Sequence, residues 1–216
     1  MSEGLLSERV YDWLLQRLMN RKLKPGDRLN RRNVAQQVGV SLSPTLEAMI
    51  RLEWEGFLQT TPRMGTLVRQ IEPDRVLGKL LLREAVETQA ARLYCGPSVV
   101  VARDRLLRLA EKVDHSDPRK IENWRAEIAF HGELVRLASC PVLLEEFHRL
   151  MRHSLFYAVN QVLPPPSQKR MPAAHAELVG ALETADPEEA DHAIRAHLQA
   201  RYESAREATL ADEGEA

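Results

Sequence analysis

Apolar positions in the first part of the chain recur at helical spacing in three segments. They predict helices at residues 5–20 and 44–55, with a short helix between its N-cap, Asn30, and Gly39, which ends it. The segment FLQTTPRMGTLVRQI, residues 57–71, alternates apolar and polar side chains like the two strands of a hairpin. Three helices and a hairpin predict a winged helix-turn-helix, in which the third helix enters the major groove of DNA.

The rest of the chain carries helical patterns separated by prolines, which cannot continue a helix. The predicted helices span residues 74–94, 98–114, 119–139, 141–162, 168–184 and 187–208. About six helices predict an antiparallel all-helical bundle whose interior can hold a ligand. The fold class is therefore mainly α, with a winged helix-turn-helix at residues 1–70, a linker at 71–76, an all-helical domain at 77–208 and a disordered tail at 209–216.

Composition narrows the class of protein. With 44% hydrophobic residues the 216-residue chain can bury a core, and no run reaches the roughly 18 apolar residues that a membrane span needs. The start, MSEGLLSERV, has no signal-peptide pattern, and the spacing of Cys95 and Cys140 fits neither a disulfide framework nor a metal site. We therefore expect a cytoplasmic protein with no membrane partner.

Charge is unevenly distributed along the chain. Residues 1–70 contain 11 Lys and Arg against 7 Asp and Glu, a net charge of +4, whereas the remainder contains 19 against 24, a net charge of −5. All 7 histidines lie in the second part. The N-terminal part is basic and lacks histidine, whereas the C-terminal part is acidic and contains it. This difference indicates two domains with different partners.

Motifs of the first domain resemble those of one family of regulators. The turn Pro25-Gly26-Asp27-Arg28-Leu29, the stretches from Val34 to Ser41 and from Ser41 to Met49, and the segment from Gly56 to Val68 are similar to the winged-helix domain of GntR-family transcription regulators. The resemblance implies that this domain binds double-stranded operator DNA. The positions expected to meet DNA are Arg28, Arg31, Arg32, Leu42, Ser43, Thr45, Leu46, Arg63 and Gly65.

The second domain resembles the all-helical effector domain, often called FCD, of the FadR subfamily. The matching stretches are LLREAVETQAARL, EIAFHGELVRLASCPVL and HAELVGALETADPEEADHAIRAHL. In that subfamily one Asp and three His commonly bind a divalent metal, and the corresponding positions here are Glu127, His131, His175 and His197. Three imidazoles and a carboxylate suit zinc first, with nickel and manganese as alternatives.

Spacing supports part of this metal set, because Glu127 and His131 at i and i+4 share one helical face. Glu127 departs from the family's Asp by one methylene, so its carboxylate must fold back or the metal must shift. Spacing alone would favour separate polar and core histidines. The remaining histidines match no family position, and we expect them at the surface or at helix ends: His115, His148, His153 and His192.

Arg83 matches an arginine of the family that tends to face the effector cavity, and its planar fork suits a carboxylate. Together with the metal, it implies a small organic acid as effector. Tyr157 and Asn160 are candidates to line the same cavity. The alternative for Arg83 is an intrahelical ion pair with Glu87, four residues further on.

An apolar row in the third helix departs from the family pattern. Leu42, Leu46 and Ile50, called the apolar row below, stand where the family commonly has basic residues. The core face of this helix is predicted to consist of Thr45, Ala48, Met49 and Leu52. Three hypotheses follow. The row contacts thymine methyl groups, it packs on the effector domain or another subunit, or the domain has lost DNA binding.

The sequence as a whole predicts a ligand-responsive transcription regulator that binds a pseudo-palindromic operator as a homodimer. We expect the protein to repress transcription and the effector to relieve that repression. One alternative is a metal-dependent sensor that has lost DNA binding and acts on a protein partner. The other is an enzyme whose metal activates water on a small carboxylate, although the sequence shows no nucleophile-and-base constellation and no phosphate-binding glycine loop.

Overall fold

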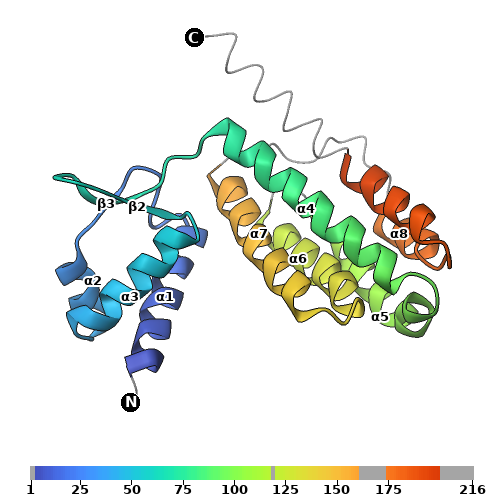
Figure 1. The fold of residues 1–216 in the computed structure, drawn as a ribbon, viewed down its shortest axis with the longest axis horizontal. Helices are drawn as coiled ribbons and strands as arrows, with labels where there is room; N and C mark the ends of the chain where they lie inside the picture. The colour runs from blue at the N-terminus through green and yellow to red at the C-terminus, as the bar shows by residue number, and fades with distance from the viewer. Residues whose placement is uncertain (1–2, 118–119, 161–173, 200–216) are drawn as a thin grey trace, which may run out of the picture. The chain divides into compact units, whose positions relative to one another are not determined.

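Three helices and a small sheet make up the first unit, Met1–Glu72, of the computed structural model (Figure 1). The structure describes residues 3–117, 120–160 and 174–199. The helices are α1 (Glu3–Met19), α2 (Arg31–Val38) and α3 (Leu42–Trp54), and α1 packs against both of the others. The antiparallel sheet has the order β1 (Arg28–Leu29), β3 (Gly65–Val68), β2 (Leu58–Thr61). This arrangement confirms the predicted winged helix-turn-helix.

The strand β1 is missing from the prediction. Arg28 pairs with Leu67 and Leu29 with Thr66, so the short strand extends the predicted hairpin to a third strand. A strand of two residues is too short to show an alternating pattern in the sequence. The preceding Pro25-Gly26 indicates only a turn. That turn is present, because Gly26 has a φ of +89°, which glycine adopts at little cost.

The ends of α2 are those predicted. The Asn30 side-chain oxygen accepts hydrogen bonds from the backbone N–H groups of Arg32 at 2.9 Å and Asn33 at 3.2 Å. Gly39, with a φ of +72°, ends the helix in the left-handed region. The N–H groups of a first helical turn have no partner within the helix, so the Asn30 cap satisfies two of them.

Asn30→Ala is expected to lower the free energy of unfolding of the first unit by about 1 kcal/mol, the usual effect of losing an N-cap. Urea denaturation followed by far-UV circular dichroism measures the change. Asn33→Ala is the matched control, because it removes the same amide from an exposed position of α2 that caps nothing. Equal destabilisation by both variants would show that the cap itself contributes nothing.

The helix α3 begins at Leu42, two residues before the predicted start, with Pro44 inside its first turn. Proline is tolerated there because N–H groups of the first turn have no helical partner. The predicted core face is confirmed, since these side chains are buried: Thr45, Ala48, Met49 and Leu52.

The second unit, Pro73–Ala216, is all-helical among its described residues. Its helices are α4 (Pro73–Tyr94), α5 (Pro97–Asp114), α6 (Ile121–Leu137), α7 (Pro141–Val159) and α8 (Ala174–Ala181), and residues 187–199 are also helical. Figure 1 shows these helices side by side as a bundle, in which α4 packs against α6 and α7, and α5 against α6 and α8. The predicted helical bundle is therefore confirmed.

Several helix boundaries differ from the prediction by one to three residues, and one of them shortens the predicted linker. The helix α4 begins at Pro73, so residues 73–76 of the predicted linker are helical, and Val76 is buried. Proline is well suited to the first turn of a helix, so Pro73 begins a helix rather than breaking one. Predicted helical residues 168–173 and 200–208, and the predicted disordered tail at 209–216, lie outside the described residues.

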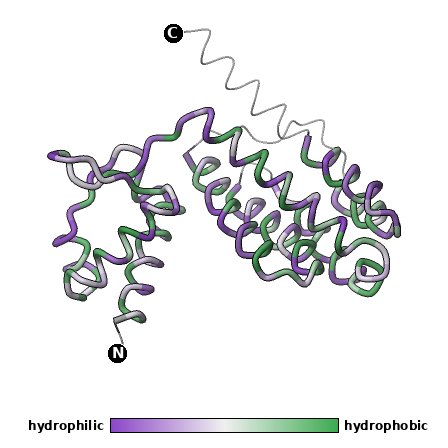
Figure 2. The backbone as a smooth tube through the Cα atoms, viewed as in Figure 1, coloured by the Kyte–Doolittle hydropathy of each residue, from purple (hydrophilic) through white to green (hydrophobic). Residues whose placement is uncertain are grey.

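Each helix of the second unit carries both apolar and polar positions, as the colours of Figure 2 show. The apolar positions meet in a core that includes Tyr94, Leu106, Phe130, Phe147 and Ile194. This core holds the helices that carry the histidines in fixed positions. Among the described residues, no helix has the length and hydropathy needed to cross a bilayer.

Candidate metal centre and DNA-binding surface

Three histidines from three separate helices converge inside the second unit. His131 comes from α6, His175 from the first turn of α8, and His197 from the helical residues 187–199. Each offers one ring nitrogen, and these three atoms all lie within 4.8 Å of one another. His131 and His175 are fully buried and His197 is partly buried. Such a group of imidazole nitrogens is compatible with a divalent metal site.

Glu127 lies at the same place, one helical turn before His131 on α6. Its Oε2 is 3.5 Å from His131 Nε2, and its Oε1 is 3.7 Å from His175 Nε2. The carboxylate therefore faces the outer nitrogens of two histidines, and its side chain is buried. Of the predicted metal set, the three histidines form one group, and Glu127 lies beside two of them.

The opposite nitrogens of two histidines are held by carboxylates. Glu87 Oε2 is 2.6 Å from His131 Nδ1, and Asp114 Oδ1 is 2.6 Å from His175 Nδ1. An Nδ1–H that donates to a carboxylate leaves the Nε2 lone pair available to a metal, and also fixes the orientation of the ring. Sequence reasoning did not assign Asp114, and it considered Glu87 only as a partner of Arg83.

One buried atom supports the fit of the cluster to a cation. His131 Nε2 is buried and makes no hydrogen bond among the described residues. A buried polar atom that makes no hydrogen bond costs about 1–3 kcal/mol, and a metal ion at this nitrogen would remove that cost. Phe130 meets the rings of His131 and His175 edge-on, at centroid distances of 5.1 and 5.0 Å, and adds an apolar wall. The residues present therefore fit a bound metal.

Arg83 makes the ion pair with Glu87 that was the alternative prediction. The distance from Arg83 Nε to Glu87 Oε1 is 2.5 Å, and both side chains are buried. Burial alone would raise the pKa of Glu87, but Arg83 and His131 outweigh it and lower this pKa to about 2. Glu87 is therefore ionised, and it connects Arg83 to the histidine cluster.

The other predicted effector contacts lie on α7. Tyr157 is buried, and its ring lies 5.9 Å from that of His153 and 6.2 Å from that of Phe156. Asn160 follows α7, and its side-chain amide donates a 2.8 Å hydrogen bond to the Phe156 carbonyl. The side-chain nitrogen of Asn160 thus closes a helix end, and the effector contacts of both residues stay predictions.

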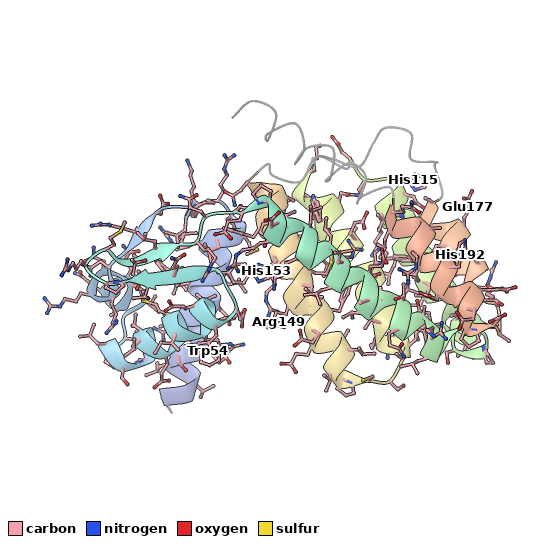
Figure 3. The ribbon with its side chains drawn as sticks, turned by 45° about the horizontal axis from the view of Figure 1, so that its top comes forward. Trp54, His115, Arg149, His153, Glu177 and His192 are labelled. Atoms are coloured by element: carbon pink, nitrogen blue, oxygen red, sulfur yellow. The ribbon has the colours of Figure 1, made fainter. Side chains whose placement is uncertain are left out.

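The remaining histidines divide between surface and core. His115 and His192, both labelled in Figure 3, are exposed, and so is His148. The prediction of a surface or helix-end position is wrong for His153, which is buried within α7. His153 packs beside Tyr157, so its ring completes an aromatic contact that single-residue reasoning does not reveal.

Most residues predicted to meet DNA lie on the surface of the first unit. Arg28, at β1, and Arg31 and Arg32, at the start of α2, are exposed, as is Ser43 in the first turn of α3. Arg63 and Gly65 are exposed at the turn between β2 and β3, both with positive φ. The first turn of α3 also lacks a side-chain cap, because Ser41 makes no capping hydrogen bond.

Thr45 requires a correction. Its side chain is fully buried, and its hydroxyl donates a 2.9 Å hydrogen bond to the carbonyl of Ser41. The side chain is therefore turned into the core of the first unit and away from any DNA-facing surface. In the apolar row, Leu42 and Ile50 are exposed and Leu46 is partly buried, so the predicted outward face is present.

Comparisons with known proteins agree with this architecture. Residues 6–68 match the family described as bacterial regulatory proteins, gntR family, and residues 80–200 match the FCD domain. An uncharacterized HTH-type transcriptional regulator in an unstable DNA locus of Streptomyces ambofaciens is 31% identical over 205 residues, which are 90% of this chain and 82% of that protein.

Two further comparisons extend over nearly the whole chain. The HTH-type transcriptional repressor RspR of Escherichia coli (strain K12) is 24% identical over 211 residues, which are 94% of this chain and 90% of RspR. The solved structure of E. coli McbR/YncC has a similar fold, with a TM-score of 0.70 and 23% identity, covering 96% of this chain and 98% of that one.

A winged helix-turn-helix followed by a helical domain of this kind defines a DNA-binding transcription regulator rather than an enzyme. The chain belongs to the GntR family of bacterial regulatory proteins and carries an FCD domain.

Proposed function

We propose that this protein is an effector-responsive repressor, whose helical unit binds a divalent metal and a small organic acid. It binds a pseudo-palindromic operator as a homodimer in the cytoplasm, and the acid weakens that binding. The observation that carries the proposal is the convergence of His131, His175 and His197, with carboxylates holding Nδ1 of the first two. Such an arrangement prepares imidazoles for metal binding.

In this proposal the three histidines hold the metal, and Glu127 supplies a carboxylate at the same site. Zinc suits three imidazoles and one carboxylate best, with nickel and manganese as alternatives. A bound metal supplies a positive centre that attracts the carboxylate of an acid. Asp114 and Glu87 orient the rings, and Phe130 limits the access of water from one side.

Arg83 is proposed as the second contact of the acid, because it is a buried basic side chain that Glu87 connects to the metal set. Arg83 contacts Glu87, and Glu87 contacts His131. An acid that pairs with the Arg83 guanidinium would change the balance of charges around Glu87, and would thereby act on the orientation of His131. Tyr157 and Asn160 stay candidates for the lining of this site.

For the first unit we propose that exposed basic residues hold the phosphate backbone, while α3 enters the major groove. The basic residues are Arg28, Arg31, Arg32 and Arg63. The uncapped N–H groups at the start of α3 suit a phosphate, as helix N-termini generally do. Ser43 and the backbone at Gly65 are further expected contacts.

The experiment that tests this function begins with selection of DNA in vitro by the full-length protein. The recovered site is then titrated by fluorescence anisotropy, with and without zinc, against a panel of small mono- and dicarboxylic acids. We expect a palindromic site, and one class of acid that weakens binding by about 5–150-fold only when zinc is present. His197→Ala is expected to abolish the zinc dependence, whereas His192→Ala on the same helix keeps it.

Two outcomes would overturn the proposal. Failure to enrich any sequence would argue against operator binding. The second outcome is a recovered site whose affinity responds equally to acids with and without zinc, both for the native protein and for His197→Ala. That result would show that the response to acids does not depend on the metal.

A further inference from the structure

The outward face of α3 carries the apolar row where a DNA-reading helix needs to meet base edges. Leu42 is 47% exposed and Ile50 is 44% exposed, with the partly buried Leu46 one turn from each. Trp54, one turn after Ile50 and labelled in Figure 3, is 85% exposed. Other side chains of α3 fill the core of the first unit, so its packing does not require the apolar row to be apolar.

The helix α3 offers no free guanidinium to the major groove. Arg51 is the one basic residue among its 13 residues, all of which are described. Its Nη1 lies 2.6 Å from Glu8 Oε1, and its Nε lies 3.3 Å from Glu55 Oε1. Its guanidinium carbon also lies 3.9 Å from the centroid of the Tyr11 ring. Arg51 is thus bound towards α1, so the commonest specific contact, arginine to guanine, is not available from α3.

The surroundings of the apolar row identify its occupant as nucleic acid. The same unit exposes basic side chains on β1, on the start of α2 and at the turn between β2 and β3: Arg28, Arg31, Arg32 and Arg63. Basic residues on neighbouring elements of one unit suit the phosphates that border a groove. In the major groove, the one apolar group on a base edge is the C5-methyl of thymine.

We propose that Leu42 and Leu46 determine operator specificity by contacting thymine methyl groups. One turn of helix separates them by about 6 Å along the axis, close to two base-pair steps of about 3.4 Å. Glu47, exposed beside Leu46, can accept a hydrogen bond from the N4 amino group of cytosine. Each half-site of the operator therefore contains two thymines that lie two base-pair steps apart. This inference rests on the proposed DNA binding by the first unit.

The test replaces single thymines by uracil, which removes the methyl group and keeps the base pair. Selection in vitro supplies the site, and anisotropy titrations compare each thymine with uracil at two salt concentrations. We expect two positions per half-site at which uracil weakens binding about fourfold, the factor for one buried methyl-sized group. This factor is expected to be equal at both salt concentrations, whereas the overall affinity falls with salt because of phosphate contacts.

Variants assign the methyl contacts to residues. Leu42→Ala is expected to remove the effect of uracil at one position, and Leu46→Ala at the other. Leu5→Ala is the matched control, because Leu5 is a 61% exposed leucine on α1 of the same unit and is expected to leave both effects unchanged. Circular dichroism of each variant checks that the fold is kept, above all for Leu46→Ala, because Leu46 is partly buried.

The outcomes separate this inference from the proposed function. A selected site that binds equally well with uracil at every thymine overturns the methyl contacts and leaves operator binding intact. Analytical ultracentrifugation measures the oligomeric state of Leu42→Ala and Leu46→Ala. If this state changes while the sensitivity to uracil does not, the apolar row contacts a second copy of the protein, and the inference is overturned. Failure to select any DNA overturns both the inference and the proposed function.

Discussion

Removal of zinc from the proposed metal site with a chelator is expected to lower the melting temperature of the helical unit by roughly 8–16 °C. A ligand present at about 1,000 times its Kd stabilises the native state by about 4 kcal/mol. For a chain of this size, 1 kcal/mol shifts the melting temperature by about 2–4 °C. The effect is large because the three histidines come from separate helices, so a bound metal holds α6, α8 and residues 187–199 together.

Differential scanning calorimetry of the zinc-loaded and chelated protein measures this change. His175→Ala is expected to melt at the same temperature in both conditions, since it removes a buried member of the cluster. His192→Ala, which removes an exposed histidine, is expected to keep the full zinc effect. An identical melting temperature for the native protein with and without zinc, nickel or manganese would count against the metal site.

Glu87→Gln is expected to lower the free energy of unfolding by about 3–5 kcal/mol, because it leaves the Arg83 guanidinium buried without its carboxylate. The same change weakens the support of the His131 ring, so metal affinity is expected to fall about 10–100-fold. Urea denaturation and calorimetric metal titration measure the two effects.

A double variant separates the effect of the lost charge on stability from the effect of the changed side-chain shape. Arg83→Met combined with Glu87→Gln removes both charges and keeps similar volumes, so most of the lost stability is expected to return. Glu188→Gln is the surface control, because its pair with Arg92 is exposed and its loss is expected to change stability little. If Glu87→Gln proves as mild as Glu188→Gln, the buried pair has no special role in stability.

The sequence predicted those parts of the protein that depend on periodicity within one helix. The core face of α3, the cap at Asn30 and the pairing of Glu127 with His131 on one face of α6 all follow from residue spacing and local hydrogen bonding. The family resemblance added His175 and His197, whose separation along the chain carries no geometric signal. Prolines predicted the breaks before α5 and α7, because Pro97 and Pro141 lie in the first turns of these helices.

The missed features depend on contacts between elements. Asp114 contacts His175 from the end of α5, and no spacing relates two residues so far apart in the chain. The strand β1 exists because β3 offers it hydrogen-bonding partners. The burial of His153 and of the Glu87 carboxylate depends on how α4, α6 and α7 pack, and that packing is set by the whole core.

The origin of the three histidines in distant segments also affects the amount of protein in a cell. An unfolded chain does not hold His131, His175 and His197 near one another, so binding of the proposed metal and folding of the helical unit would be coupled. Chains without metal spend more time in partly open states, and proteases remove such chains first. Metal supply would then set the abundance of the regulator through its rate of degradation, independently of any change in its affinity for DNA.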